Sequence, residues 1–342
     1  MHLVSRLPLS FMFFKHWHTD DTEVGVVIAK ARFERAADGG YYATHTPPEL
    51  LLEDIYEGDP ATSPLVSEQD IAPAKIGTDL IIKAVARAPE AKPAPDWPVS
   101  VSIADKLHYS FRVRGPSKWE HKMLGWKLGE PEPVTEVPIT YALAYGGISA
   151  GADADHPEVF EFNPSGTGIT TPQSRENKES FAAPQIGELA EFMAADPEMD
   201  MTVHGFGPIA KTWLPRRADA GTFDTAWRQT RHPRMPMDYG LGFWNAAPKP
   251  LQISPALTGN ETITLSGINH AVDPIDVRLP DVALTIRMAG EESSYQDMIL
   301  DTVLLDVSDP VTDNHSLTIL WRCLIIAPDR FESGDIQQMS ME

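Results

Sequence analysis

The amino-acid sequence predicts a mainly β fold, in which sandwich-like sheets carry a few short helices and long ordered loops. Apolar and polar residues alternate with a period of two in several segments. Gly and Pro clusters separate these segments, and no long stretch repeats its apolar residues at helical spacing. The sequence has neither a βαβ rhythm nor a repeat of fixed period, so we expect packed sheets rather than an α/β or repeat architecture.

The alternation is clearest at residues 107–113. Leu107, Tyr109, Phe111 and Val113 are apolar, and polar residues stand between them. A strand with this pattern has one buried and one solvated face. Similar patterns predict strands at residues 24–33, 41–44, 78–86, 262–266, 282–288 and 317–323.

Several connectors between these strands are long. Residues 47–73 are acidic and punctuated by Pro and Gly, which predicts a surface loop over the sheet. The four prolines of residues 89–98 indicate a stiff connector. Residues 151–180 have the composition of a long loop without regular structure, and such loops tend to be functional or mobile.

Two short helices are predicted. Residues 186–193 form the first of them. Thr222 is expected to cap a second helix that starts at Phe223 and has Asp224 in its first turn. Phe223 and Trp227 are four residues apart and therefore share a face of this helix.

The 342 residues suffice for one large β domain or roughly two domains of average size. We expect a single β-rich domain over residues 1–342. The alternative that the sequence leaves open is two lobes, at about residues 1–147 and 250–330. The loop-rich residues 150–248 would then join them.

The charge and cysteine content exclude several classes of partner. A formal net charge of -21 disfavours nucleic acid and anionic membranes, and it favours a basic protein partner. Cys323 is the only cysteine, so we expect no intrachain disulfide and no cysteine-based metal cage. The N-terminus lacks a small-residue cleavage site, and no apolar run approaches the roughly 20 residues that span a bilayer. We therefore expect a cytoplasmic protein without a cofactor.

The stretch from Gly205 to Pro248 is locally basic in an otherwise acidic chain. Its aromatic and cationic residues are Trp213, Trp227, Trp244, Arg216, Arg217, Arg228, Arg231 and Arg234. Such side chains either fix an ordered loop or anchor a partner. Arg216 and Arg217 could bind an external anion. The favoured interpretation is that they pair with Asp219, Asp224 or Asp238 and stack on tryptophan rings.

No catalytic signature occurs in the sequence, which lacks a GxSxG elbow, a Walker loop and an HExxH motif. His16 and His18 flank Trp17 and could supply two metal ligands, but solvated histidines near a terminus are favoured. Cys323 is expected to be a buried structural thiol. The Gly-rich residues 163–168 are expected to form a turn rather than a phosphate loop.

Several sequence blocks occur in a recognisable order. The most specific are FGPIAKTWLPRRADAGTFDTAW at residues 206–227 and PMDYGLGFWNAAP at residues 236–248. Further blocks are GDP at 58–60, DIAPAKIGTDLII at 70–82, LHYSFRVRGPSKW at 107–119, YALAYGG at 141–147, NPSGTG at 163–168, GNETITLSGI at 259–268, LDTVLLDV at 300–307 and LTILWR at 317–322. Over about residues 3–325 the chain resembles the bacterial domain-of-unknown-function 2169 family. Members are encoded beside type VI secretion effectors that carry PAAR-type spike-tip domains.

Members of that family are regarded as effector adaptors or chaperones. The resemblance therefore implies a non-enzymatic protein that binds and stabilises a PAAR-bearing toxin and helps to load it onto the secretion spike, whose own protein is a second expected partner. The family has no established catalytic residues to carry over. Without the pentapeptide repeats of some relatives, the chain is expected to be a stand-alone adaptor. The motif residues that the resemblance marks are Trp213, Arg216, Gly221, Thr222, Asp224, Trp227, Asp238, Trp244, Ala247 and Pro248.

Two other functions stay open on the residues alone. A hydrolase or transferase would use acid–base groups in a deep pocket, with Asp224, Asp238 and His204 or His232 as candidates. A carbohydrate- or ligand-binding module would stack its ligand on an exposed tryptophan ring, with Trp213, Trp227 or Trp244 as candidates. For an adaptor, we expect residues 205–248 and 151–180 to lie nearest the contact surface.

Overall fold

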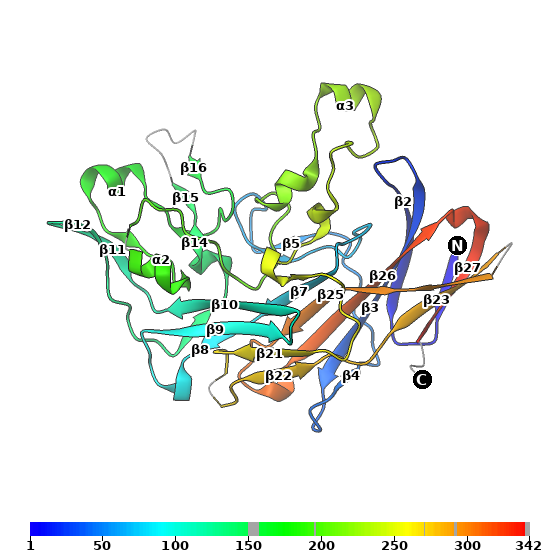
Figure 1. Ribbon diagram of the computed structural model, residues 1–342, viewed down its shortest axis with the longest axis horizontal. Helices are drawn as coiled ribbons and strands as arrows, with labels where there is room; N and C mark the ends of the chain where they lie inside the picture. Colours follow the sequence, from blue (N-terminus) through cyan, green and yellow to red (C-terminus); the bar gives the residue numbers. More distant parts are fainter. Residues whose placement is uncertain (150–156, 195, 270, 291–292, 339–342) are drawn as a thin grey trace.

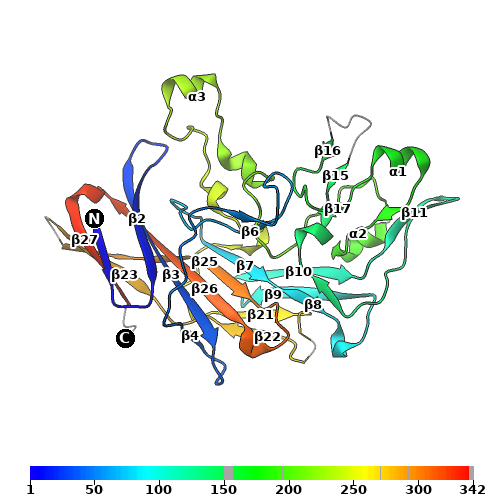
Figure 2. The ribbon, with the colours of Figure 1, turned by 180° about the vertical axis from the view of Figure 1, so that it is seen from behind.

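The computed structural model describes residues 1–149, 157–194, 196–269, 271–290 and 293–338. Strands make up 42% of the chain and helical segments 12%, so the prediction of a mainly β fold is confirmed. Figures 1 and 2 show an elongated molecule, with a small sheet at one end and a β-hairpin beside two short helices at the other. Within the described ranges, no helix is long and apolar enough to cross a membrane.

A seven-stranded sheet forms the centre of the molecule. Its strand order is β2–β3–β26–β25–β7–β20, and β4 pairs with the C-terminal part of β3. β25 and β7 are parallel, whereas the other neighbours are antiparallel. The strands are β2 (Ser10–Trp17), β3 (Glu23–Arg35), β4 (Tyr41–Ala43), β7 (Thr78–Lys83), β20 (Gln252–Ile253), β25 (Ile299–Asp306) and β26 (Ser316–Ile326).

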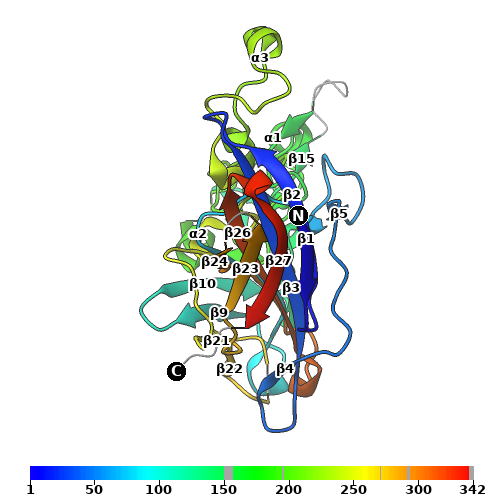
Figure 3. The same ribbon diagram turned by 90° about the vertical axis from the view of Figure 1, so that its right-hand side faces the viewer.

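Two smaller sheets share a hydrophobic core with this central sheet. A five-stranded antiparallel sheet has the order β19–β10–β9–β21–β22, and a four-stranded sheet has the order β1–β27–β23–β24. Figure 3 shows the five-stranded sheet beside the long strands β3 and β26. The strands are β9 (Asp96–Ile103), β10 (Leu107–Arg114), β19 (Ile186–Gly187), β21 (Thr262–Ser266), β22 (Ile275–Arg278), β1 (His2–Ser5), β23 (Leu284–Gly290), β24 (Ser293–Asp297) and β27 (Phe331–Gln338).

The alternating strands bury the predicted faces. On β10, the apolar residues of the pattern, from Leu107 to Val113, are all buried. On β26, Leu317, Ile319, Trp321 and Cys323 are buried in the same core. Side chains from both layers therefore meet between the sheets, as in a β-sandwich.

The predicted loop at residues 47–73 packs on the opposite face of the seven-stranded sheet. Leu50 and Ile71 of the loop contact a second cluster that includes Ile28 and Leu320. The loop also contains a short ribbon of β5 (Ile55–Tyr56) and β6 (Leu65–Ser67). Because both faces of the sheet are covered, β3 has an almost continuous apolar sequence instead of an alternating one.

The helices differ from the predicted ones. Residues 186–193 divide into β19 and α2 (Leu189–Ala194), because Ile186 pairs with Val113 of β10. α3 spans Thr225–Thr230, and its N-cap is Asp224 rather than Thr222. The carboxylate of Asp224 accepts the main-chain N–H of Trp227, so the helix begins two residues later than predicted.

The expected loop at residues 151–180 is also more regular than predicted. Its described part, residues 157–180, contains β16 (Glu158–Val159), β17 (Thr167–Gly168) and α1 (Pro172–Asn177). Residues 151–156 lie outside the described residues. Two neighbouring strands explain this order, because β14 (Tyr145–Gly146) pairs with β17 and β15 (Ile148–Ser149) pairs with β16.

The remaining elements are short. β7 and β8 divide the predicted strand at residues 78–86. The other strands are β8 (Val85–Arg87), β11 (Lys118–Lys122), β12 (Gly125–Leu128), β13 (Glu136–Pro138) and β18 (Phe181–Ala182). The 3-10 turns are Pro89–Ala91, Tyr141–Leu143, Arg216–Ala220, Leu241–Trp244, Lys249–Leu251, Thr312–Asn314 and Pro328–Arg330.

Strands from both ends of the chain alternate within the same sheets. β3 pairs with β26, β7 pairs with β25, and β9 pairs with β21. The N-terminal strand β1 likewise pairs with β27. Residues near the two ends of the chain therefore share the sheets on which the central stretch is mounted.

Candidate functional site

The basic stretch at residues 205–248 divides into two kinds of structure. Residues 205–216 and 243–248, which we call the anchored ends, lie largely buried against the body of the molecule. Residues 221–239, which we call the arm, leave the body, carry α3 and return. Figures 1 and 3 both show α3 projecting beyond the sheets. This division separates the predicted motif residues into two groups.

The aromatic residues of the anchored ends are buried. Trp213 is 1% exposed and packs edge-on against Tyr141, with ring centroids 5.8 Å apart. Trp244, Ala247 and Pro248 are buried as well. Trp213 and Trp244 are therefore unavailable as stacking surfaces for a ligand in this structure.

Arg216 is the main polar connection of the anchored ends and is 2% exposed. Its guanidinium donates to the main-chain oxygen of Phe243 at 2.6 Å and to that of Ile209 at 2.6 Å. It also pairs with the carboxylate of Glu68 at 2.5 Å. One side chain thus joins both anchored ends to the loop at residues 47–73.

The predicted partners of the two adjacent arginines were wrong. Arg217 pairs with Glu161 at 2.7 Å, and Arg216 pairs with Glu68, so neither of them pairs with Asp219, Asp224 or Asp238. The guanidinium of Arg216 also lies over the ring of Phe243, at 5.8 Å, instead of a tryptophan. Carboxylates distant in sequence reach these arginines because the loop at residues 47–73 and the segment near Glu161 fold against them.

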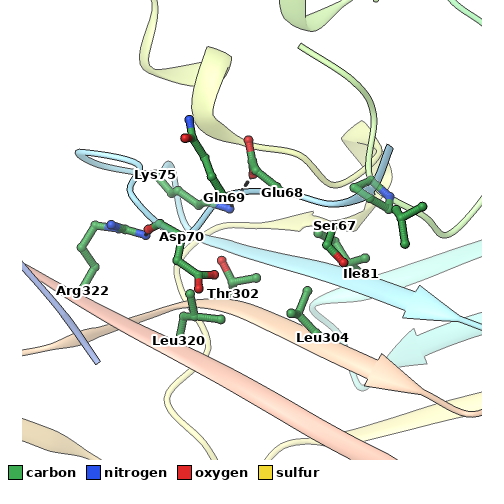
Figure 4. A pocket seen from close by; sticks show the side chains of 12 residues that line it. Ser67, Glu68, Gln69, Asp70, Lys75, Ile81, Thr302, Leu304, Leu320 and Arg322 are labelled. Atoms are coloured by element: carbon green, nitrogen blue, oxygen red, sulfur yellow. Dashed lines mark hydrogen bonds and ion pairs between the residues drawn. The ribbon is translucent and has the colours of Figure 1, made fainter. Parts of the chain in front are cut away.

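Arg216 belongs to a larger buried group of charges, which we call the ion cluster and which Figure 4 shows in part. The ion cluster lies between the loop at residues 47–73, the face of the central sheet that this loop covers, and the anchored ends. Five carboxylates balance five cations in it: Asp54, Glu68, Asp70, Asp79, Asp301, Lys30, Lys75, Lys211, Arg216 and Arg322.

Lys75 connects two carboxylates of the ion cluster. Its ammonium lies 2.9 Å from Asp79 and 3.4 Å from Glu68. Asp79 also accepts hydrogen bonds from the side chain of Asn245 at 2.9 Å and from the N–H of Ala246 at 2.8 Å. Asp79 is thus fully satisfied although it is completely buried.

The positive charges control the ionisation of Glu68. Burial alone would raise the pKa of Glu68, but the nearby charges of Lys75, Arg216 and Lys211 outweigh it and hold the pKa below its ordinary value. Glu68 is therefore ionised at neutral pH and neutralises the arginine and the lysines.

The other charges of the ion cluster lie along the sheet. Lys30 pairs with Asp70 at 2.8 Å, and Arg322 pairs with Asp301. Arg322 also donates to the main-chain oxygen of Asp70 at 3.2 Å. The cavity among these groups has a volume of about 40 Å³, which suits water but lies far below the few hundred Å³ typical of ligand sites. The ion cluster is therefore a structural connection.

Hydrogen bonds join the two ends of the arm at its base. Thr222 donates its N–H to one carboxylate oxygen of Asp238 at 3.0 Å and its hydroxyl to the other at 2.6 Å. These hydrogen bonds hold the pKa of Asp238 below its ordinary value. Gly221 begins the arm with a φ of 78°, and a Cβ there would lie 3.0 Å from Pro236. These three motif residues thus hold the outgoing and the returning segments of the arm together.

The tip of the arm is ordered around Trp227. The carboxylate of Asp224 accepts the N–H of Trp227 at 2.8 Å and caps α3. The indole N–H of Trp227 donates to the main-chain oxygen of Arg234 at 2.8 Å. Phe223 and His232 pack edge-on against the same ring, at centroid distances of 4.7 Å and 5.3 Å. Trp227 is therefore half-buried and makes most of the contacts that order the tip of the arm.

The arm also contacts the turn between β2 and β3. Arg231 donates to the main-chain oxygen of Thr19 at 2.9 Å and pairs with Asp21 at 3.1 Å. Arg234 pairs with Asp21 at 2.9 Å, and its guanidinium lies 4.9 Å from the ring centre of Trp17. These contacts give the projecting arm a second attachment.

The ordered arm presents apolar side chains to solvent. Phe223 is 53% exposed and Met237 is 67% exposed, and Trp17 beside the arm is also exposed. Exposed aromatic and Met side chains next to Arg are characteristic of protein interfaces. The arm is therefore the candidate contact surface of the protein.

The candidate acid–base residues lie in two separate places. Three of them lie on the arm. Asp224 caps α3, and the ring of His232 packs against Trp227. Asp238 accepts the hydrogen bonds of Thr222, and we call this pair the clasp. His204 is buried in the body, where the hydroxyl of Tyr109 lies 3.0 Å from its Nδ1. Burial lowers the pKa of His204. Within the described parts of the chain, no hydrogen bond or ion pair joins these residues into an acid–base pair.

The remaining residues that the sequence suggested as metal, nucleophile or phosphate sites lie in surroundings typical of structural residues. The rings of His16 and His18 lie 6.3 Å apart, and no group of three or more His, Cys, Asp or Glu side chains among the described residues could hold a metal ion. Burial raises the pKa of the Cys323 thiol to about 12. At residues 163–168, the amide of Asn163 donates to main-chain oxygens at 2.8 Å and 3.0 Å and so fixes a turn.

Sequence reasoning missed the ion cluster, although one signal was present. Asp79 interrupts the apolar strand TDLII, and Arg322 interrupts LTILWRCLII. A charge inside a buried strand requires a partner of opposite charge. The partners come from segments far away in the sequence, so only the folded chain identifies them.

A comparison with protein families supports the resemblance that the sequence blocks indicated. Residues 20–322 match the family described as "Uncharacterized protein conserved in bacteria (DUF2169)". No curated protein matches the chain, and no solved structure does. Because the family match covers most of the sequence, the chain belongs to the DUF2169 family.

Proposed function

We propose that this protein is a non-enzymatic adaptor that binds and stabilises a secreted effector in the cytoplasm of the producing cell. The resemblance to type VI secretion adaptors suggests the effector class, a toxin with a PAAR-type spike-tip domain. In this proposal the adaptor keeps the toxin folded and assists its loading onto the secretion spike.

The proposal rests on the exposed apolar surface of the ordered arm. Its clasp, its capped helix and its contacts with the β2–β3 turn keep it ordered outside the core. Phe223 and Met237 nevertheless remain exposed. An ordered apolar surface on a projecting element supports a role in binding another protein.

The charge of the chain supports a protein partner with basic segments. A formal net charge of -21 accelerates the encounter with a positively charged surface. Binding to the folded effector alone would stabilise that effector by mass action. Such a role requires no cofactor and no reacting groups.

The titratable groups of the ion cluster support a structural role for it rather than a catalytic one. A catalytic site usually combines a deep pocket with a group whose pKa is strongly perturbed and whose reactive atoms are free. The carboxylates and cations of the ion cluster are paired, and the cavity between them has a volume of only about 40 Å³, so the ion cluster is not such a site.

Affinity capture from the source bacterium tests the proposal. The tagged full-length protein would be expressed at its native level, washed at moderate salt to remove nonspecific charge contacts, and analysed by mass spectrometry. We expect one secreted effector with a PAAR-type domain to be retained. If neither an effector nor a spike component is retained while both are soluble, the adaptor function is wrong.

A further inference from the structure

A groove of about 450 Å³ lies on the body of the molecule, beside the anchored ends. Its volume falls within the range of ligand and peptide sites, unlike that of the cavity in the ion cluster. Aromatic and proline side chains form about half of its walls. They include Tyr109, Tyr141, Phe160, Phe162, Pro215 and Pro248.

One wall of the groove is formed by five consecutive residues. Five successive residues, Asp200–His204, line the groove, and the segment belongs to no helix or strand. The N–H of Thr202 donates to Glu191 at 2.7 Å. Within the described ranges, the N–H groups of Met201, Val203 and His204 and the C=O groups of residues 201–204 form no hydrogen bond. A segment with open main-chain groups beside an apolar groove is suited to a peptide that adds alongside it.

A second hollow of about 370 Å³ continues the groove, because both are lined by Phe160 and Asp200. Glu158 and Glu198 also line this hollow, together with Arg175. Arg175 pairs with Glu158 at 3.2 Å, so the carboxylates of Glu198 and Asp200 leave the hollow negative. A cation is the complementary occupant.

We propose that the two hollows together bind one extended segment of the partner, with apolar side chains at alternate positions followed by a Lys or Arg. The identity of that partner as the effector rests on the adaptor function. The apolar side chains fill the larger hollow, the peptide main chain pairs with residues 201–204, and the cation lies near Glu198. A main-chain partner of this kind would satisfy N–H and C=O groups that have no hydrogen-bond partner among the described residues.

Peptide selection tests this inference without any knowledge of the effector. A library of random dodecapeptides displayed on phage would be selected on the purified full-length protein. We expect the enriched peptides to share alternating apolar residues followed within a few positions by Lys or Arg. Affinities of the synthetic peptides would then be compared among three variants by fluorescence anisotropy.

The variants separate the apolar and the charged contributions. Phe162→Ser removes a half-exposed wall of the groove, and Glu198→Lys reverses the charge of the second hollow. Each should weaken peptide binding by about tenfold, as loss of a central interface contact does. Leu124→Ser is the matched control, because Leu124 is 98% exposed in the turn between β11 and β12 and lines neither hollow. Its affinity should stay within about twofold of the wild type.

Two results would overturn the inference. One is enrichment of peptides that bind the wild type, Phe162→Ser and Glu198→Lys equally well. The other is no enrichment of peptides while a small apolar dye, 8-anilinonaphthalene-1-sulfonate, binds the wild type and loses affinity in Phe162→Ser. Effector capture that persists in both variants would leave the adaptor function standing without this groove.

Discussion

The anchored ends and the arm are parts of one stretch with the same unusual composition, yet their side chains have opposite surroundings. Trp213 and Arg216 of the anchored ends are almost completely buried, and Arg216 pairs with Glu68 inside the ion cluster. Trp227 and Arg234 of the arm make comparable contacts at the surface. Tryptophan and arginine therefore stabilise the body in one half of the stretch and remain partly accessible in the other.

This difference has an energetic consequence. A buried charge that loses its partner destabilises the fold strongly, because it stays desolvated without compensation. An exposed ion pair contributes little, because water and salt screen it. Changes in the ion cluster should therefore affect folding, whereas changes in the arm should affect binding.

The largest effect is expected for Glu68→Gln. This substitution keeps the shape of the side chain but leaves Arg216 and Lys75 with less negative charge in a buried site. We expect the free energy of unfolding, measured by urea denaturation, to fall by about 3–5 kcal/mol.

The surface pair of Glu161 and Arg217 supplies the matched control. Glu161→Gln removes a carboxylate of a pair in which both side chains are about half exposed. We expect the free energy of unfolding to change by less than about 1 kcal/mol. Equal losses in Glu161→Gln and Glu68→Gln would contradict the distinction between the two regions.

The ion cluster also predicts how stability depends on pH. Despite burial, the charges of Lys75 and Arg216 keep the pKa of Glu68 below its ordinary value of 4.5, so its contribution is present above pH 4.5 and is lost as the pH falls through the lowered pKa. Lys75 titrates in the opposite sense. Burial lowers its pKa, but Asp79 and Glu68 outweigh burial and raise it above 10.5, so this contribution is present below pH 10.5 and is lost as the pH rises through the raised pKa.

Urea midpoints measured at several pH values would check this dependence. Between pH 7 and the acid side of 4.5, the wild type should lose more stability than Glu68→Gln, which has no carboxylate to protonate at that position. Parallel curves for the two proteins would show that Glu68 does not titrate differently in the folded and unfolded states.

A smaller and local effect is expected at the cap of α3. Asp224→Ala removes the hydrogen bond to the N–H of Trp227 and should destabilise the helix by about 1 kcal/mol. Because α3 projects from the body, amide hydrogen exchange should accelerate at residues 225–230 while the global urea midpoint stays unchanged. Asp38→Ala is a suitable control, because Asp38 accepts the N–H of Gly40 in a distant turn. A shift of the global midpoint in Asp224→Ala alone would show that the arm folds together with the body.

The local patterns of the sequence predicted much of the fold. Period-two alternation identified the buried face of β10, because this strand contacts the core from one side only. It also identified the face of β26 that enters the main core, although Leu320 on the other face is buried as well. It could not place the start of the first predicted helix, since Ile186 pairs with Val113, which lies 73 residues away in the sequence. Tertiary pairing of this kind overrides local helix propensity.

The candidate site was predictable in part. Composition singled out the stretch at residues 205–248, and the sequence predicted a short capped helix in it, although with Thr222 rather than Asp224 as the cap. The division into anchored ends and arm was not predictable, because Trp213 and Trp227 have the same chemistry and differ only in what the rest of the chain places against them. The partner of Arg216 was missed for the same reason, since Glu68 lies 148 residues away.

The affinity of the effector for an arm variant tests the central claim most directly. Phe223→Ser combined with Met237→Ser removes the two large exposed apolar side chains of the arm, and Leu124→Ser removes an even more exposed one elsewhere. With the captured effector purified, isothermal titration calorimetry should show an affinity at least about tenfold weaker for the arm variant and unchanged for the control, with the same urea midpoint in both. If the arm variant binds the effector as tightly as the wild type, the arm is not the contact surface.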